Sequence, residues 1–343
     1  MTNLPNFERP ISGEFRKLIE DYGNAGMKVI PVDAIGSPKH LRSRLGLTDE
    51  DFTVCAFMGS RVPKGMEGLS TIVRGYPRLL AQLDQQHHLQ MPRLSGGGNW
   101  NLLKPKENGL MAQWARGATE NGHPAHFVTM QGLIELEGLP RALGASAFLK
   151  QLPGEERIGE RTDGLLCVGD MFIVFPGGLG TTTEMSALFT NSSIRRTVKS
   201  KKAILFDPIF EDPKTGEVSR YWEPIIKLLV LQNHAGLIGD DTMKNINNHC
   251  VVYRPDSGLS PKQVTRELLS LTLAIRDLSR EDNLHPEFRK TYSVPISTGS
   301  HLARVFQDHE ANGTWVNDLD SLMKPRLPIA KAARHMHKEP ALN

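Results

Sequence analysis

Short apolar runs alternate with glycine-containing turns and helical stretches through the middle of the chain. Such runs occupy residues 53–58, 126–130, 171–175, 202–206 and 250–253, and each is long enough for one strand. The run at 171–175 is apolar at every position, which is typical of a strand buried on both faces of a sheet. Strands of this kind in alternation with helices predict a parallel sheet that is covered on both sides.

Four stretches between or after these strands carry a helical pattern. In the first, Leu110, Trp114 and Ala118 recur at helical spacing, and Gly122 provides a C-terminal stop. The predicted helices span residues 109–121, 161–168, 183–196 and 221–231. Together with the strands they predict an α/β domain over residues 51–256, with a Rossmann-like, doubly wound parallel sheet.

The two ends of the chain have a different character. Residues 1–50 are predicted to be an N-terminal extension, with one helix at 11–22 and an apolar run at 27–30. Residues 257–343 are predicted to be a C-terminal helical extension and tail. This segment opens with an amphipathic helix at 261–278, where Pro261 occupies a tolerated position in the first turn. We interpret the basic stretch at residues 331–338 as a solvated chain end.

Composition narrows the possible functions. The 343 residues contain 41 Lys and Arg against 38 Asp and Glu, a balance that favours no nucleic-acid partner. Cys55, Cys167 and Cys250 stand too far apart for a disulfide framework or a zinc motif, so we expect a cytoplasmic protein. The start lacks a secretory signal, and no apolar run approaches the roughly 20 residues of a membrane span.

Seven of the 31 glycines fall in three turns that follow predicted strands: Gly59, Gly96, Gly97, Gly98, Gly177, Gly178 and Gly180. The most informative turn is the sequence PGGLGTTTE at residues 176–184, between the strand at 171–175 and the helix at 183–196. In a parallel sheet, ligands bind beyond the carboxyl ends of the strands. Glycines allow close approach of the backbone, and the N–H groups at a helix start attract anions. The segment therefore predicts a phosphate site.

This turn is neither of the two commonest phosphate loops. No Lys follows Gly180, which excludes a Walker A loop, and Thr183 replaces the third glycine of a dinucleotide fingerprint. A glycine-rich turn without a ligand remains an alternative. Glu184 at the helix start has a simple interpretation as a charge favoured by the helix dipole. A carboxylate there also suits a ligand that develops positive charge, as in N-glycosidic cleavage.

The sequence PGGLGTTTE resembles the PGGxGTxxE motif of the LOG (LONELY GUY) family, nucleoside 5′-monophosphate phosphoribohydrolases also known as lysine decarboxylase-like proteins. Arg161 precedes Glu184 by 23 residues, where this family places its catalytic Arg. The similarity extends over residues 52–255 and includes the turns at 59–60 and 95–98. It departs from the family at Thr162, which replaces a Lys, and in the insertion at 99–108.

The resemblance implies an enzyme that hydrolyses a nucleoside 5′-monophosphate, of the AMP or cytokinin riboside type, to the free base and ribose 5-phosphate. It implies catalytic roles for Arg161 and Glu184, no cofactor and no metal, and a homodimer or larger homo-oligomer. The residues expected to bind substrate are Gly59, Ser60, Arg61, Gly96, Gly97, Gly98, Asp170, Gly177, Gly178, Gly180, Thr181 and Thr183. Glu184 would act as a nucleophile, as an electrostatic stabiliser or as a ligand of the ribose hydroxyls.

Other interpretations remain open at this point. The same scaffold occurs in modules that bind nucleotides without cleaving them. Arg161 could form a surface ion pair with one of the nearby acidic residues, Glu155, Glu156 and Glu160. Trp100 could stack on a base or simply pack. A pyridoxal phosphate enzyme is disfavoured because no Lys lies between Arg161 and Lys199. The histidines at 123, 126 and 234 lie outside the motifs, and we interpret them as structural.

Overall fold

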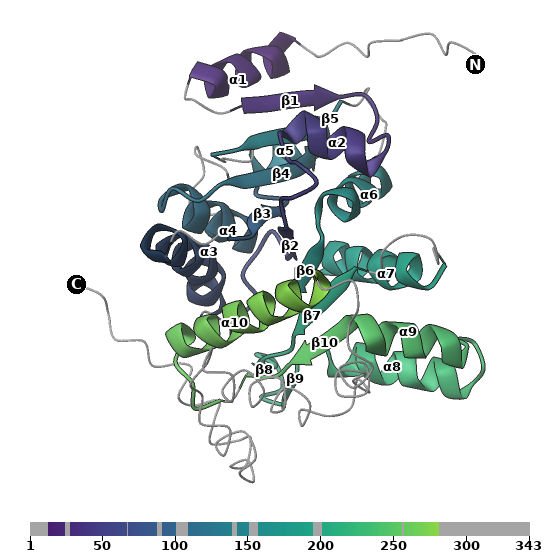
Figure 1. The fold of residues 1–343 in the computed structure, drawn as a ribbon. Helices are drawn as coiled ribbons and strands as arrows, with labels where there is room; N and C mark the ends of the chain where they lie inside the picture. Colours follow the sequence, from purple (N-terminus) through teal and green to yellow (C-terminus); the bar gives the residue numbers. More distant parts are fainter. Residues whose placement is uncertain are drawn as a thin grey trace, which may run out of the picture.

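The computed structural model describes residues 13–24, 28–66, 68–87, 91–100, 109–138, 143–150, 157–194, 201–255 and 257–280. Its centre is one sheet of eight parallel strands in the order β1-β5-β4-β3-β2-β6-β7-β10 (Figure 1). The strands are β1 (Lys28–Val32), β2 (Thr53–Phe57), β3 (Arg93–Gly96), β4 (Ala125–Met130), β5 (Ala145–Leu149), β6 (Met171–Val174), β7 (Lys202–Phe206) and β10 (Cys250–Tyr253). The predicted α/β, Rossmann-like fold class is confirmed.

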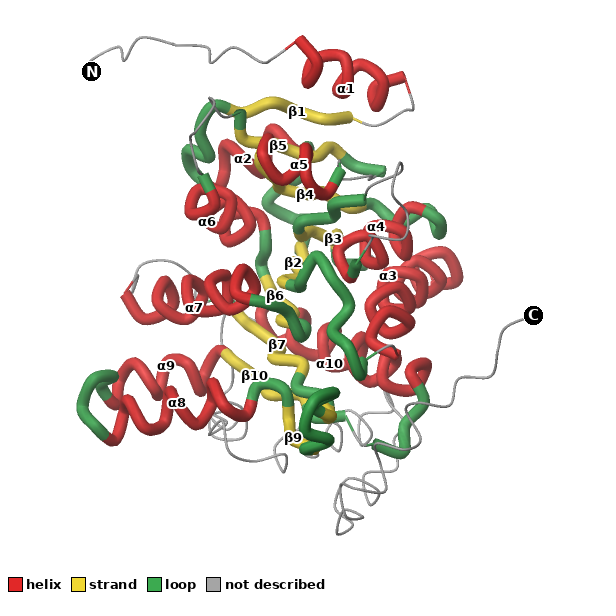
Figure 2. Tube along the Cα trace, turned by 180° about the vertical axis from the view of Figure 1, so that it is seen from behind, coloured by secondary structure: helices red, strands yellow, loops and turns green. Residues whose placement is uncertain are grey.

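Helices cover both faces of the sheet. They are α1 (Gly13–Asn24), α2 (Pro38–Leu45), α3 (Gly68–His87), α4 (Leu110–Thr119), α5 (Gln131–Glu137), α6 (Ile158–Val168), α7 (Leu179–Ile194), α8 (Glu223–His234), α9 (Asp240–His249) and α10 (Pro261–Arg280). Helices α3, α4 and α10 lie on one side, and α2, α6, α7, α8 and α9 lie on the other (Figures 1 and 2).

The alternation of side chains along β2 shows how this layering arises. Val54 and Ala56 belong to the core under α3, α4 and α10, whereas Cys55 and Phe57 belong to the core under the helices of the opposite face. All five residues of β2 are buried, because successive side chains point to opposite covered faces. The continuous apolar strand is thus a direct consequence of two hydrophobic layers.

The chain order of the strands reverses beside β2. From β2 the chain moves outward through β3, β4 and β5 on one side, then returns to β6 on the other side of β2 and continues to β7 and β10. In open parallel sheets, this reversal separates the loops on either side and leaves a crevice at the carboxyl ends of the two strands. By this rule, the ligand crevice of this sheet is expected between the turns that follow β2 and β6.

Both predicted extensions contribute elements to this fold. Strand β1 pairs with β5 at the edge of the sheet, and α2 packs against α6. Helix α10 packs against α3 and reaches Arg280, two residues beyond the predicted end. The basic stretch at 331–338 lies outside the described residues.

Some boundaries differ from the sequence prediction. Helix α7 begins at Leu179, four residues earlier than predicted, so that Gly180 lies in its first turn. The predicted helix at 221–231 is α8, which runs from Glu223 to His234. Between β7 and α8 lies a short antiparallel hairpin, β8 (Ile209–Glu211) and β9 (Val218–Arg220), that the sequence pattern did not indicate.

Candidate active site

Two glycine turns meet backbone to backbone at the crevice. Gly59 follows β2 and Gly177 follows β6, and a Cβ added to Gly177 would lie 2.7 Å from the Gly59 nitrogen and 2.2 Å from Thr181 Oγ1. No side chain fits at this contact, so Gly177 is required by the close approach of the two loops. The predicted turns are therefore neighbours, although they are far apart in the sequence.

The loop after Gly177 is open. Gly178, Leu179 and Gly180 are exposed, and no atom lies within 4 Å of a Cβ added to either glycine. The first N–H bond of α7 runs from Thr182 to the Gly178 carbonyl at 3.1 Å, so the preceding N–H groups have no partner within the helix. Thr181 is buried beneath the loop, and the exposed Thr183 donates its hydroxyl to the Leu179 carbonyl at 3.0 Å.

Arg161 and Glu184 form a buried ion pair beside this loop. Arg161 Nη1 donates to Glu184 Oε1 at 2.7 Å, and each side chain is only 8% exposed. The Nε of Arg161 is buried and has no hydrogen-bond partner among the described residues. The alternative of a surface pair is not observed: Glu160 pairs with Arg157, while Glu155 and Glu156 lie outside the described residues.

Burial sets the electrostatics of this pair. Desolvation raises the pKa of Glu184, while the guanidinium of Arg161 opposes that shift. Burial of such a pair costs desolvation free energy, and a hydrophobic pair of similar volume is often at least as stable. The pair therefore suggests a role other than stability. Perturbed carboxyl groups in crevices are for this reason candidates for functional sites.

The Gly96–Gly98 turn after β3 packs directly on the guanidinium. A Cβ added to Gly97 would lie 2.6 Å from Arg161 Nη2 and 2.4 Å from Met111 Sδ. Gly98 has φ +64°, and a Cβ there would lie 2.3 Å from the ring of Phe127. Glycines at 97 and 98 thus permit the turn to pack closely on Arg161. Gly96 is the last residue of β3, so the turn begins directly after this strand.

The turn after β2 is held against helix α4. A Cβ added to Gly109, which precedes α4, would lie 1.9 Å from the Ser60 carbonyl oxygen. Ser60 is half-buried and its hydroxyl hydrogen-bonds with the carboxyl of Glu137. Arg61 is exposed.

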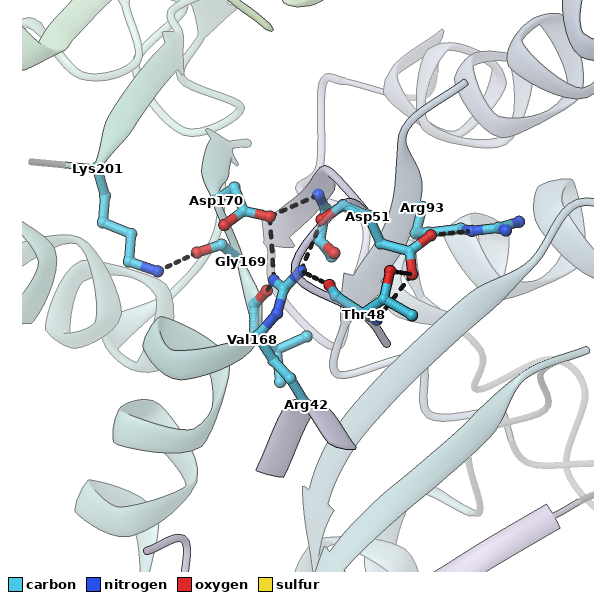
Figure 3. Close-up of polar contacts among 9 residues, drawn as sticks. Arg42, Thr48, Asp51, Arg93, Val168, Gly169, Asp170 and Lys201 are labelled. Atoms are coloured by element: carbon cyan, nitrogen blue, oxygen red, sulfur yellow. Dashed lines mark hydrogen bonds and ion pairs between the residues drawn. The ribbon is translucent and has the colours of Figure 1, made fainter. Parts of the chain in front are cut away.

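Asp170 lies away from all these residues. It precedes β6, at the amino edge of the sheet, where its carboxylate accepts hydrogen bonds from Arg42 Nη1 at 3.0 Å and from the Thr53 N–H at 2.8 Å (Figure 3). The glycine loop follows the same strand, so β6 separates the two by roughly 13 Å at about 3.3 Å per residue. The structure therefore does not bring Asp170 to the crevice, and its carboxylate joins α2 to the start of β2.

One carboxyl group near Arg161, that of Glu137, was not identified from the sequence. Glu137, the last residue of α5, is half-buried, and its Oε2 is a buried atom with no hydrogen-bond partner among the residues that the structure describes. Arg161 and Glu137 interact electrostatically, and Glu137 also raises the pKa of Glu184. No local motif marks Glu137; only its position a few residues after the strand at 126–130 could have indicated it.

A tyrosine that follows the β8–β9 hairpin also reaches the glycine loop. Tyr221 lies directly after β9 and donates its hydroxyl to the Gly177 carbonyl at 2.7 Å. No sequence pattern indicated this contact, because Tyr221 lay in a predicted helix and the hairpin that precedes it was not predicted.

The aromatic and histidine side chains near the motifs have packing roles. Trp100 is 9% exposed, and the guanidinium of Arg116 lies over its ring at 5.3 Å from the centroid. His123 and His126 are buried at the amino end of β4, against backbone carbonyls. Within the described residues, no group of three or more His, Cys, Asp or Glu could hold a metal ion.

The glycine loop, the buried ion pair and the reversal of strand order define a doubly wound α/β protein with a candidate anion site at its switch point. Residues 111–251 match the family model described as "Possible lysine decarboxylase". Over these residues, the match confirms the predicted resemblance to the LOG-like, lysine decarboxylase-like family.

Other comparisons add little detail. No curated protein matches the chain. Among solved structures, the molybdenum cofactor binding protein from the phototrophic bacterium Rippkaea orientalis is similar at 14% identity and a TM-score of 0.35, over 66% of this chain and 99% of that one. In the described part of the chain, no helix has the length and apolar character of a membrane span.

Proposed function

We propose that this protein hydrolyses the N-glycosidic bond of a nucleoside 5′-monophosphate, releasing the free base and ribose 5-phosphate. The observation that carries the proposal is the buried ion pair between Arg161 and Glu184, four residues along α7 from Gly180. Residues four apart on a helix lie on one face, one turn from each other. A phosphate at the glycine loop would thus set the attached ribose beside Glu184.

The glycine loop supplies the anion site. The N–H groups at the start of α7 and the helix dipole both favour negative charge at this point. The exposure of Gly178 and Gly180 leaves room for a phosphate to approach the backbone. Backbone donors carry no net charge, which suits a site that must also accept a carboxylate nearby.

The carboxylate of Glu184 would stabilise the positive charge that develops on the ribose during the reaction. As the bond from C1′ to the base breaks, the ribose ring gains positive charge, and a carboxylate in a buried setting interacts with that charge far more strongly than one in water. In the ground state the ribose is neutral, so this interaction strengthens as the bond breaks and lowers the barrier. The same carboxylate can accept a proton from the water that adds to C1′.

Arg161 fixes the direction of this carboxylate. Its guanidinium is a rigid fork that holds Glu184 through one N–H group, and Nε has no hydrogen-bond partner among the described residues. Packing of Gly97 on the guanidinium prevents the fork from rotating away. Arg161 is thus a positioning residue with a spare donor for the phosphate or the ribose.

The test is release of base from a panel of nucleotides: AMP, GMP, CMP, UMP, IMP and isopentenyl-AMP, followed by chromatography. We expect at least one to be cleaved. Glu184→Gln should lower kcat by about 100- to 1000-fold, because an electrostatic contribution of this kind is typically worth 10²–10³. Glu217→Gln is the matched control, since Glu217 is exposed in the turn of the β8–β9 hairpin.

Two outcomes would contradict the proposal. Tight binding of a nucleotide without release of base from any member of the panel would make the protein a non-catalytic nucleotide-binding module. Full activity of a correctly folded Glu184→Gln variant would remove Glu184 from the reaction.

A further inference from the structure

Glu137 presents an unsatisfied oxygen to the crevice. Its Oε2 is a buried atom with no hydrogen-bond partner within the described part of the chain. A buried carboxylate oxygen without a partner is costly, and the cost falls if the oxygen carries a proton or meets a ligand. We therefore interpret the Glu137 carboxyl as part of a ligand site rather than as part of the hydrophobic core.

Two turns hold the end of α5 that carries this carboxyl. Ser60, after β2, hydrogen-bonds with it. Asn99, after the Gly96–Gly98 turn, donates from Nδ2 to the Gly138 carbonyl at 2.8 Å, and Gly138 N–H donates to the Ile134 carbonyl at 2.9 Å. The end of α5 is thus tied to the same loops that surround Arg161. Hydrogen bonds of this kind hold a functional side chain in a fixed position.

The charges around Glu137 decide its protonation. Arg161 and Glu184 are the charged groups that act on it among the described residues, so two carboxyl groups share one guanidinium. Arg161 donates its hydrogen bond to Glu184, not to Glu137. Of two neighbouring carboxyl groups, the one without the cation takes up the proton first. Burial also raises the pKa of Glu137.

We propose that Glu137 is the general acid that protonates the departing base, an inference that rests on the proposed hydrolysis. In this step the bond between C1′ and the base nitrogen breaks, its electron pair stays on the base, and the Glu137 carboxyl transfers its proton to a ring nitrogen of the base. Water then adds to C1′ and loses a proton to Glu184. Passage of that proton to Glu137 through solvent restores both groups.

The division of labour between the two carboxyl groups is the one that glycosidases use, with an acid for the leaving group and a carboxylate for the sugar. It also explains why the site retains two acidic residues around a single Arg. A pair of groups whose surroundings separate their protonation identifies the acid and the base.

The test compares two leaving groups. One substrate is the nucleotide that the wild-type protein cleaves fastest, and the other is 4-nitrophenyl β-D-ribofuranoside 5-phosphate, whose nitrophenolate departs without a proton. We expect Glu137→Gln to lower kcat for the nucleotide by about 100-fold or more, as loss of a general acid does, and for the nitrophenyl compound by less than about threefold. Glu184→Gln should lose activity on both, and Glu217→Gln on neither.

The pH profile gives a second readout. A general acid must hold its proton, so kcat for the nucleotide in the wild type should decline as pH rises past the pKa of Glu137. Glutamine cannot titrate, so this decline should be absent from the residual activity of Glu137→Gln. If the wild type cleaves the nucleotide but not the nitrophenyl compound, the two pH profiles alone test whether Glu137 is the general acid.

Equal losses on the two substrates, or full nucleotide activity in Glu137→Gln, would overturn the role of Glu137 while the proposed hydrolysis stands. Absence of any base release by the wild-type protein would instead overturn the hydrolysis, and this inference with it. Circular dichroism and a thermal melt of each variant establish that the fold is intact.

Discussion

At the scale of single residues, the crevice concentrates charge where the fold is most crowded. Arg161 and Glu184 are buried to the same degree, and Gly97 packs so closely on the guanidinium that no side chain fits between them. Breaking a buried pair by removing one partner leaves an uncompensated charge, which is more damaging than the pair is stabilising. Substitutions at 97, 161 and 184 are therefore coupled, and their effects on stability should not add.

His126 offers a residue-scale prediction about pH. Burial lowers the pKa of His126 to about 4, below the 6.5 of an exposed imidazole. The unfolded chain therefore takes up a proton at His126 below about pH 6.5 while the folded protein does not, so stability falls as pH drops toward 4. This difference corresponds to about 3 kcal/mol of unfolding free energy at most.

The measurement is the free energy of unfolding in urea between pH 7 and pH 4, for the wild type and for His126→Gln. The variant should lose less stability over this range than the wild type. Identical pH dependence in the two proteins would show that His126 is not buried in its neutral form.

At the scale of elements, the glycine loop depends on a hairpin that is not part of the main sheet. The carbonyl of Gly177 points to the Tyr221 hydroxyl, and in a trans peptide the N–H of the next residue points the opposite way. Tyr221 thereby sets the direction of the Gly178 N–H, one of the donors that we assign to phosphate. The β8–β9 hairpin, which brings Tyr221 to this point, is thus a support for the loop.

This arrangement predicts the behaviour of Tyr221→Phe. Loss of the hydroxyl should raise KM for the nucleotide by about fivefold, equivalent to about 1 kcal/mol for one hydrogen bond, with kcat nearly unchanged. Competitive inhibition by ribose 5-phosphate should weaken to the same extent. A fall in kcat with KM unchanged would contradict a role in holding the phosphate loop.

The elements also show how far the sequence could lead. Strands β2, β4, β6, β7 and β10 were predicted from their apolar runs and are confirmed. Helix α3 was not predicted, since Pro77 in its interior interrupts the expected pattern, and β5 was hidden in the mixed segment at 131–153 by its small residues. Propensity is weak at such places, and tertiary packing decides the structure.

The candidate site was predictable where a motif was local. The PGGLGTTTE segment and the spacing of Arg161 identified two side chains that the structure joins at 2.7 Å. Glu137 depends on the meeting of two separate turns with the end of α5, so no local pattern marks it. Asp170 was assigned to the site from the family resemblance, but a strand lies between it and the glycine loop, and the two ends of this strand belong to opposite edges of the sheet.

At the scale of the whole molecule, the N-terminal segment and the central sheet should unfold as one unit. Leu41 in α2 is 1% exposed and belongs to the core that includes β2, β6 and α7 residues. Leu41→Ala should lower the free energy of unfolding by about 3 kcal/mol and retain a single transition in urea. Leu228→Ala on α8, where the side chain is 53% exposed, is the control and should change it by less than about 0.5 kcal/mol. Two separate transitions would show that residues 28–45 form an independent unit.

The contact between Gly59 and Gly177 joins points more than one hundred residues apart in the sequence. Contacts of such separation form late, because the chain must first close a long loop. During synthesis the crevice cannot exist until β6 has left the ribosome and paired with β2. A ligand bound between these turns would therefore link the two halves of the sheet. It would stabilise the fully folded protein, because a partly folded chain lacks the binding site.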